Sequence, residues 1–473
     1  MELIGRDTQR KSFRHYTQSS ESKLIAVYGR RRIGKTFLIR EHFSDDLTFE
    51  VSGLYQGDMS DQLSHFAQAL VKAGYYEATL APPEDWMSAF EMLGLYIDTL
   101  KGKKKKILFI DELPWLDTPR SKFLMAFENF WNSYCTKRKD ILLVICGSAA
   151  SWMIQKIVKN KGGLHNRVAE HINLKPFSLY ETEKYLISKG IKWSKYDITQ
   201  LYMIVGGIPY YLDKVQKGES VAQFVNRACF TEGGPLYDEY EILYASLFNN
   251  NERHEEIVEI LSKTKTGIKR KEIIAKSKAG SGGTLTKVLD ELDKSGFIQK
   301  VIPYGARKNN ALYKLVDNFT IFYWKYMQSR GKRITDDWTK KASGPSWNSW
   351  SGFAFERVCF AHIPQIKKAL LLQAIECEIS TWNSTDAQID MLIDRADNIV
   401  HIGEIKFAIA DYEITSVYAK NLRNKIASFR SLKANGRKVL WLTMITTFGV
   451  KDNMHSKELV QNEVTLKDLF SKG

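Results

Sequence analysis

The feature that most constrains this chain is an eight-residue glycine loop near its amino end. An apolar stretch, Ser22 to Tyr28, precedes the loop and Phe37-Leu38-Ile39 follows it, so we expect strand, loop and helix in that order. The loop residues are Gly29, Arg30, Arg31, Arg32, Ile33, Gly34, Lys35 and Thr36. Its glycines let backbone N–H groups point at phosphate oxygens, and the helix N-terminus adds a positive dipole end. This pattern predicts that Lys35 reaches the β- and γ-phosphates of a nucleotide and that Thr36 holds Mg²⁺.

A second apolar run ends in two carboxylates. Ile107 to Ile110 reads as a parallel strand buried on both faces, and Asp111 and Glu112 follow it. Chemistry in such sheets lies at the carboxyl ends of the strands. We therefore expect Asp111 to hold Mg²⁺ through water and Glu112 to activate the attacking water. The lysines at 103–106 read as a solvated strand entry rather than a DNA patch.

A third strand, Ile141 to Gly147, ends at Ser148. A polar side chain there can sense the γ-phosphate. The alternative is a small residue that caps the next helix.

Six segments occur in an order that resembles one family. They are Gly5-Arg6, the glycine loop, FIDELPWL at 109–116, ICGSAASWM at 145–153, LKPFSL at 174–179 and GGIPYYL at 206–212. The chain is similar over nearly its whole length to the prokaryotic archaeal-type ATPase family, a STAND/AAA-like branch of the P-loop ATPases. The resemblance implies ATP as the nucleotide, Asp111 and Glu112 as the Walker B pair, Ser148 as a sensor, and 206–209 in a helical lid.

The arginines admit two interpretations each. Arg167 keeps the arginine of a family motif whose preceding residues differ here; it either neutralises phosphoryl charge, in cis or from a neighbouring subunit, or lies on a surface loop. Of Arg30, Arg31 and Arg32, we expect at least one to touch nucleotide and most to face solvent.

Composition bounds the remaining possibilities. No apolar stretch approaches the length of a membrane helix, and the first residues lack the apolar core of a signal peptide. The five cysteines are scattered singly, which argues against zinc. We expect a cytoplasmic protein of prokaryotic type. The formal net charge of +15 favours nucleic acid as a partner.

Residues 249–327 read as a winged helix. Helices are expected at 255–261, 269–276 and from Thr284 to Gly296, with a turn at 280–283 and a basic wing at 304–310 between two apolar stretches. Lys287, Arg307 and Lys308 can meet DNA phosphates. The alternative is a module that only packs over the nucleotide.

The last region, 350–473, has the element order of the restriction-endonuclease-like, PD-(D/E)xK fold. We expect a helix carrying Glu356, strands at 374–381, 388–393 and 399–406, a helix at 416–432 and a strand at 438–444. Alternation on a strand puts Glu404 and Lys406 on one face, with Asp390 beside them. Glu356, Asp390 and Glu404 are the expected metal ligands, and Lys406 the catalytic cation. Lys420, Arg423 and Lys425 either line a DNA path or form a solvated basic face.

The predicted architecture is α/β throughout. It consists of a P-loop ATPase core (1–175), a helical lid (176–248), a winged helix (249–327), a linker (328–349) and a nuclease-like domain (350–473). The favoured function is ATP binding and hydrolysis coupled to DNA binding or cleavage in the tail. The alternatives are a STAND-type signalling switch with an inactive tail and a winged-helix DNA-binding regulator. The sequence leaves homo-oligomerisation open.

Overall fold

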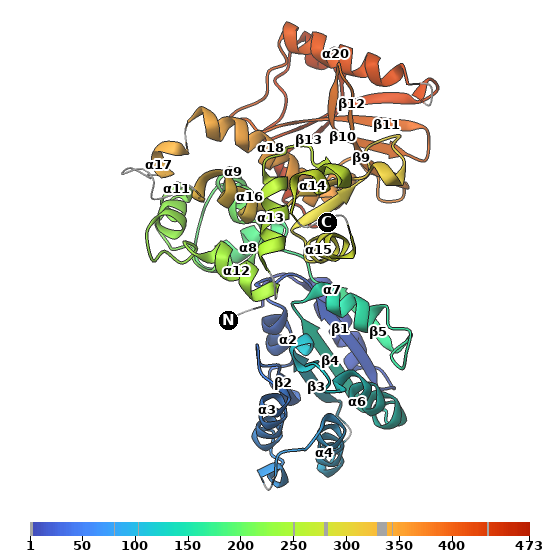
Figure 1. The fold of residues 1–473 in the computed structure, drawn as a ribbon. Helices are drawn as coiled ribbons and strands as arrows, with labels where there is room; N and C mark the ends of the chain where they lie inside the picture. The colour runs from blue at the N-terminus through green and yellow to red at the C-terminus, as the bar shows by residue number, and fades with distance from the viewer. Residues whose placement is uncertain are drawn as a thin grey trace. The chain divides into compact units, whose positions relative to one another are not determined.

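The computed structural model describes residues 3–79, 81–102, 104–248, 251–278, 282–328, 338–342, 344–432 and 435–473. These residues form two compact units, Met1–Lys175 and Pro176–Gly473. The first unit is built on one β-sheet, and the second contains a five-stranded and a three-stranded β-sheet (Figure 1). No helix in the described part of the chain is long and apolar enough to cross a membrane.

The first unit contains a parallel sheet of five strands in the order β2-β3-β4-β1-β5. The strands are β1 Lys23–Tyr28, β2 Leu47–Ser52, β3 Lys106–Asp111, β4 Ile141–Gly147 and β5 Val168–Asn173. The helices are α1 Asp7–Thr17, α2 Lys35–Phe43, α3 Met59–Lys72, α4 Trp86–Thr99, α5 Leu113–Leu116, α6 Phe123–Asn129 and α7 Ala150–Trp152. Strand β4 therefore lies between the strand that precedes the glycine loop and the strand that ends in Asp111.

Helices cover both faces of this sheet (Figure 1). One face contributes alternate residues such as Leu24 and Ile110 to a core shared with α3, α4 and α6. Strands β3 and β4 are buried along their whole length, as a central parallel strand must be. This burial explains the continuous apolar runs in the sequence, because every residue of these two strands is buried.

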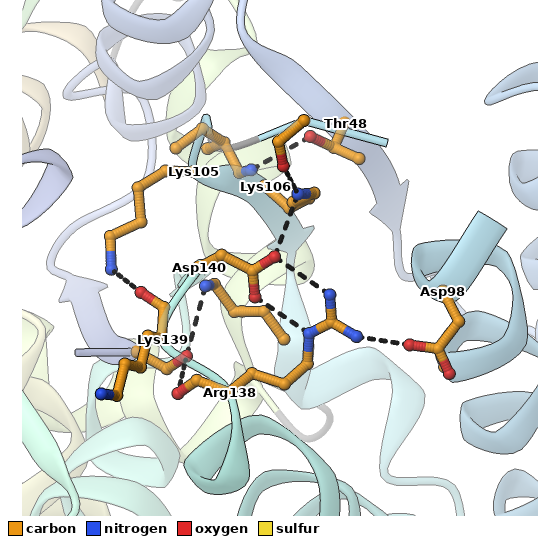
Figure 2. A network of polar contacts seen from close by, with 12 residues as sticks. Thr48, Asp98, Lys105, Lys106, Arg138, Lys139 and Asp140 are labelled. Atoms are coloured by element: carbon orange, nitrogen blue, oxygen red, sulfur yellow. Dashed lines mark hydrogen bonds and ion pairs between the residues drawn. The ribbon is translucent and has the colours of Figure 1, made fainter. Parts of the chain in front are cut away.

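The amino-terminal edge of the sheet carries a network of ion pairs (Figure 2). The Lys106 ammonium lies 3.0 Å from Asp140, and the Arg138 guanidinium donates to both oxygens of the same carboxylate at 2.9 and 3.0 Å. Arg138 also pairs with Asp98. Hydrogen bonds from Arg138 hold the pKa of Asp140 well below its usual range. The expectation of a solvated lysine run is thus wrong for Lys106, which is buried and paired; Lys103 lies outside the described residues.

The second unit begins with helices and a small antiparallel sheet. Its first helices are α8 Leu179–Ser188, α9 Lys195–Val205, α10 Pro209–Leu212, α11 Val221–Val225 and α12 Glu239–Leu247. Then follow α13 Asn251–Ser262, β6 Ile268–Lys269, α14 Arg270–Lys276, α15 Gly283–Lys294, β7 Ile298–Val301 and β8 Leu312–Leu315, with strand order β6-β8-β7. The turn predicted at 280–283 lies partly outside the described residues.

Glycines explain the close approach between the backbone at Phe177 and the turn that joins α9 to α10. Gly206 ends α9 with a φ of 68°, and a Cβ on Gly207 would lie 1.9 Å from the carbonyl oxygen of Phe177. The Phe177 N–H donates to the Gly207 carbonyl at 2.7 Å, and Pro209 opens α10. Two of the motifs noted in the sequence, at 174–179 and 206–212, therefore meet in one backbone contact.

The rest of the second unit is a mixed sheet with helices. Its elements are α16 Asn318–Phe322, α17 Trp338–Lys341, α18 Pro345–Ala361, α19 Ile363–Ala369, β9 Cys377–Asn383, β10 Gln388–Arg395, β11 Ile399–Lys406, α20 Ser416–Arg430, β12 Val439–Thr446, α21 Met454–Leu459, β13 Val460–Val464 and α22 Leu466–Leu469. The strand order is β13-β12-β11-β10-β9, antiparallel from β9 to β11 and parallel from β11 to β13.

The segment predicted as a linker at 328–349 is partly structured. Trp338 and Trp347 are buried against each other, and α18 begins at Pro345, five residues before the predicted helix start. Proline is favoured in the first turn of a helix, where its missing N–H costs nothing. Residues 329–337 and 343 lie outside the described residues.

Candidate functional site

The glycine loop has the backbone that phosphate binding requires. Gly29 has a φ of 144°, and a Cβ there would lie 2.4 Å from the Leu174 carbonyl oxygen, so only glycine fits. Gly34 has a φ of 81° and starts α2. The Lys35 ammonium donates to the carbonyls of Gly29 and Arg30 at 3.1 and 3.0 Å. The loop is thus closed around its lysine, at the N-terminus of a helix.

A direct hydrogen bond joins this loop to the end of β3. The Thr36 hydroxyl donates to Asp111 Oδ2 at 2.8 Å, although the two residues lie 75 positions apart. Asp111 is 4% exposed, and its other oxygen lies 2.7 Å from the Cys146 thiol on β4. Burial raises the pKa of Cys146, so the thiol keeps its proton and donates it. A hydroxyl beside a carboxylate at a phosphate loop is a donor set that fits Mg²⁺.

Glu112 is held by the neighbouring strand. Its Oε2 accepts from the Ser148 backbone N–H at 2.9 Å and from the Ser148 hydroxyl at 2.8 Å. The Glu112 backbone is left-handed, with a φ of 44°. The Ser148 hydroxyl does not cap α7, whose cap position is Ala149. Of the two interpretations of Ser148, the helix cap is therefore wrong, and the side chain instead contacts the predicted catalytic carboxylate.

Arg167 lies far from the phosphate loop within this chain. It is exposed and directly precedes β5, whose Val168 pairs with Leu24 at the start of β1. The loop follows the opposite end of β1, about five residues or roughly 16 Å along the strand. No residue of the described chain forms a hydrogen bond or ion pair with the Arg167 side chain. The geometry does not support a role in cis, while the neighbouring-subunit and surface interpretations stand.

The three loop arginines are less exposed than expected. Arg30 is buried, and Arg31 and Arg32 are half-buried. The Arg31 guanidinium lies 5.9 Å from the centre of the Trp115 ring. Arg32 adopts a left-handed backbone with a φ of 70°. The expectation that most of them face solvent is wrong, because the tight loop turns them onto the protein.

Arg6 has a structural role that the sequence did not reveal. Its guanidinium donates to the Ile33 carbonyl inside the glycine loop at 3.2 Å and to the Lys175 carbonyl at 2.7 Å. Arg6 is 6% exposed. Its place in the Gly5-Arg6 motif was the only signal. We infer that Arg6 stabilises the glycine loop by joining its Ile33 carbonyl to the Lys175 carbonyl.

The second candidate site surrounds Glu404, which is 1% exposed. Lys406 donates to its Oε1 at 2.7 Å and Lys425 to its Oε2 at 2.7 Å. The Tyr418 hydroxyl donates to Oε1 at 2.5 Å. Glu404 and Lys406 thus lie on one face of β11, while Lys425 and Tyr418 come from α20. Burial alone would raise the pKa of Glu404, but the two ammonium groups outweigh it and lower this pKa.

Asp390 and Glu356 lie within electrostatic reach of this group. Asp390 Oδ2 accepts from the Ile405 N–H at 3.0 Å, and burial together with Glu404 raises the Asp390 pKa. Burial and the Asp390 charge raise the pKa of Glu356 to about 7. Lys314, from β8, is a further cation whose charge interacts with both acids, and the sequence gave no signal for it.

The three predicted metal ligands do not form a metal cage in this geometry. Within the described ranges, no group of three or more His, Cys, Asp or Glu side chains is arranged to hold a metal ion. The reason is local, since both oxygens of Glu404 already accept from lysines. The described geometry does not gather Glu356, Asp390 and Glu404 as one ligand set, and their role as metal ligands stays a prediction.

The predicted wing packs on the last sheet. The Tyr304 N–H donates to the Thr381 carbonyl at 3.0 Å, and its hydroxyl donates to Asn435 at 2.6 Å. Arg307 is exposed, and the Lys308 side chain lies outside the described residues. Lys287 is 74% exposed and lies 3.9 Å from Glu291. Tyr304 of the predicted wing is therefore engaged within the chain, while Arg307 is exposed.

The basic residues of α20 divide in the same way. Lys420 is exposed, whereas Arg423 pairs with Glu458 at 2.6 Å. Lys425 pairs with Glu404. Of these three residues, Lys420 is the one that is exposed without an ion pair in the described chain.

Comparison with known proteins bears on the first site. Residues 3–215 match the model of a family described as an ATPase domain predominantly from Archaea. An uncharacterized protein of Methanocaldococcus jannaschii, MJECL04, is 24% identical over 437 residues, covering 88% of this chain and 90% of its own.

Two solved structures extend the comparison. The Walker-type ATPase PABY2304 of Pyrococcus abyssi has a TM-score of 0.52 at 16% identity, covering 68% of this chain and 96% of that chain. The Aeropyrum pernix ORC2 protein has a TM-score of 0.41 at 14% identity, covering 72% of this chain and 96% of that chain. The first of these likenesses supports the fold.

Proposed function

We propose that the chain is a Mg²⁺-dependent ATPase whose nucleotide state acts on a DNA-binding, nuclease-like region at 350–473. The match of residues 3–215 to the model of an ATPase domain predominantly from Archaea supports the first part of this proposal. The observation that carries the first half is the hydrogen bond from Thr36 to Asp111. It joins the phosphate loop to the strand end where Mg²⁺ chemistry takes place.

Each residue of the nucleotide site has a chemical task. Lys35 neutralises charge on the β- and γ-phosphates, while Thr36 and Asp111 hold Mg²⁺, which supplies further charge neutralisation. Glu112 orients and activates the attacking water. In the described geometry Ser148 donates to one oxygen of the Glu112 carboxylate, Oε2, so the other oxygen can accept from the attacking water. Ser148 is the proposed sensor of the γ-phosphate.

The proposal for the tail rests on charge and side-chain placement. A chain with a formal net charge of +15 attracts polyanions. Glu404, Lys406 and Asp390 gather at the end of β11. Since the carboxylates do not form a metal cage, no metal-dependent step is assigned to them. Lys406 and Lys425 are the groups that can stabilise a phosphodiester charge there.

A second function is favoured by the same geometry. Glu404 accepts hydrogen bonds from two lysines and a tyrosine, and this arrangement is also typical of a structural ion cluster. In that case the chain is a nucleotide-controlled switch with an inactive tail. A DNA-binding regulator that uses 249–327 is the third candidate, supported by exposed Arg307 and Lys287.

One experiment separates these functions. Purified protein is incubated with linear, circular and single-stranded DNA, with Mg²⁺ or Mn²⁺, with and without ATP. Lys35→Ala and Lys406→Ala proteins are run in parallel, with Lys420→Ala as the matched control on an exposed lysine. Cutting that is lost in Lys406→Ala and altered in Lys35→Ala supports the ATP-controlled nuclease. Lys35-dependent ATP turnover without cutting supports the switch, and DNA binding weakened by Arg307→Ala supports the regulator.

A further inference from the structure

The family match ends at a different residue from the boundary between the two compact units. The ATPase family match runs to residue 215, whereas the second compact unit begins at Pro176. Helices α8, α9 and α10 therefore belong to the ATPase domain by sequence and to the carboxyl-terminal unit by packing. Any contact between these helices and the last sheet joins the two proposed activities physically.

Helix α9 makes such a contact through Tyr196 in its first turn. The Tyr196 ring is stacked on Phe407, with centroids 4.9 Å apart and planes at 9°. It also stacks on Phe448 at 5.9 Å and 19°. Phe407 directly follows Lys406 at the end of β11. The ring of a lid residue thus stacks on the residue that directly follows the predicted catalytic lysine.

The stack continues to the other side of the site. Phe407 contacts Phe355 on α18, with centroids 5.2 Å apart. Phe355 directly precedes Glu356. Phe407 therefore touches both Tyr196 and the neighbour of Glu356, and is itself the neighbour of Lys406. A shift of α9 changes the support of both charged residues at once.

The lid is fastened to α18 at a second point. The buried His362 ring accepts from the Leu179 N–H at 2.8 Å through Nε2, and its Nδ1 donates to the Val358 carbonyl at 2.7 Å. This bond joins the first residue of α8 to the end of α18. Helix α8 therefore contacts the end of α18 directly, and Tyr196 of α9 reaches α18 through Phe407 and Phe355.

Ordinary packing explains the stack less well. Phe448 is 47% exposed, and Tyr196 and Phe407 are only half-buried. Rings that remain partly in water contribute less burial energy than core rings do. A row of aromatic rings beside a charged site is better suited to fixing the orientation of the residues next to it.

We propose that Tyr196 is a positioning residue: through Phe407 it sets the placement of Lys406 and Glu356, so that the tail senses the nucleotide state of the ATPase domain at this ring stack. The inference rests on the proposed function for the nucleotide site. It requires neither DNA cleavage nor a metal in the tail.

The test measures amide hydrogen exchange in the full-length protein, with and without Mg²⁺ and a non-hydrolysable ATP analogue. The peptides of interest cover 353–358 and 404–408. We compare the unchanged protein with Tyr196→Ala, Tyr196→Phe, which keeps the ring, and Tyr180→Ala, a control on α8 whose ring contacts Lys184 of the same helix. ATP turnover is measured for each protein.

The expected result is a nucleotide-dependent change in exchange at both peptides in the unchanged, Tyr196→Phe and Tyr180→Ala proteins, and its loss in Tyr196→Ala with ATP turnover retained. A response that persists in Tyr196→Ala overturns the proposal. So does an equal loss in Tyr180→Ala, which would indicate general disturbance of the lid, or turnover without any response in the unchanged protein. Absence of ATP turnover in the unchanged protein would instead refute the proposed ATPase function.

Discussion

The nucleotide site and the Glu404 site both gather charged side chains at the carboxyl end of strands, yet they hold them differently. Around Asp111, each contact is made by a residue at the end of a neighbouring strand or in the loop after it, such as Thr36 and Cys146. Around Glu404, the partners come from β11 and from α20, and they neutralise a carboxylate that is 1% exposed. Substitutions should therefore alter activity in the first site and stability in the second.

The largest effect expected is on ATP turnover in Glu112→Gln. Loss of a general base lowers turnover by about 100-fold or more. Glutamine has the same shape and its carbonyl oxygen still accepts from Ser148, so nucleotide binding and thermal stability should be retained. Turnover is compared with the affinity for a fluorescent ATP analogue, and Ser148→Ala serves as the partner variant. Unchanged turnover in Glu112→Gln would remove Glu112 from the catalytic role.

The second effect concerns acid stability in the carboxyl-terminal unit. Burial lowers the pKa of His362 to about 4, from about 6.5 in the unfolded chain. Between these two pKa values the imidazole of His362 is therefore protonated in the unfolded state and neutral in the native state. Stability from this group is complete above pH 6.5 and is lost as the pH falls toward 4, by about 3 kcal/mol in total.

His362→Gln stays neutral throughout, so its unfolding free energy should change less between pH 7 and pH 4 than that of the unchanged protein. Urea unfolding at several pH values measures this. In the first unit the pKa of Asp140 is held low by Arg138, so its contribution is complete above the usual aspartate pKa and is lost as the pH falls from there through the lowered native pKa. Loss of structure in the first unit before the second on acidification would contradict this difference.

Sequence reasoning succeeded where a site is local along the chain. The glycine loop, Asp111 and Ser148 each directly follow an apolar strand, and parallel strands bring such ends to one edge. It identified β11 with its Glu404 and Lys406, because alternation places i and i+2 on one face.

What it missed depends on tertiary packing. Lys425 reaches Glu404 from 21 residues further along, and Lys314 comes from a different sheet. Strand β13, Val460–Val464, has three consecutive polar residues, so its sequence lacks the alternation of a strand, and it pairs with β12 in the structure. No short-range pattern reports contacts of this kind. The described geometry does not gather the predicted metal ligands for a similar reason, since Lys425, expected on a DNA path or a solvated face, instead donates to Glu404 from α20.

The third prediction compares two cations on α20. Lys425→Met removes one partner of the buried Glu404, and we expect a loss of about 2 kcal/mol, below the full cost of an unpaired buried charge because Lys406 and Tyr418 remain. Arg423→Met, the control, breaks a pair whose side chains are 43% and 54% exposed and should cost less than about 1 kcal/mol. Urea unfolding of both variants measures the difference. Equal losses would mean that the Glu404 cluster contributes no more than a surface ion pair.

The smallest effect is expected at the amino-terminal edge of the first sheet. Arg138→Met removes the pairs with Asp98 and Asp140 and should lower stability by about 1 kcal/mol, since these groups are partly solvated and Lys106 still neutralises Asp140. Because this edge lies at the opposite end of the strands from the glycine loop, ATP turnover should not change. Lys104→Met, which removes a pair at a 92% exposed lysine, is the control and should change nothing. Thermal unfolding and DNA binding are measured together. If Arg138→Met left stability intact but weakened DNA binding, the network at this edge would be a nucleic-acid surface, and the first unit would share in a task that we assign to the second.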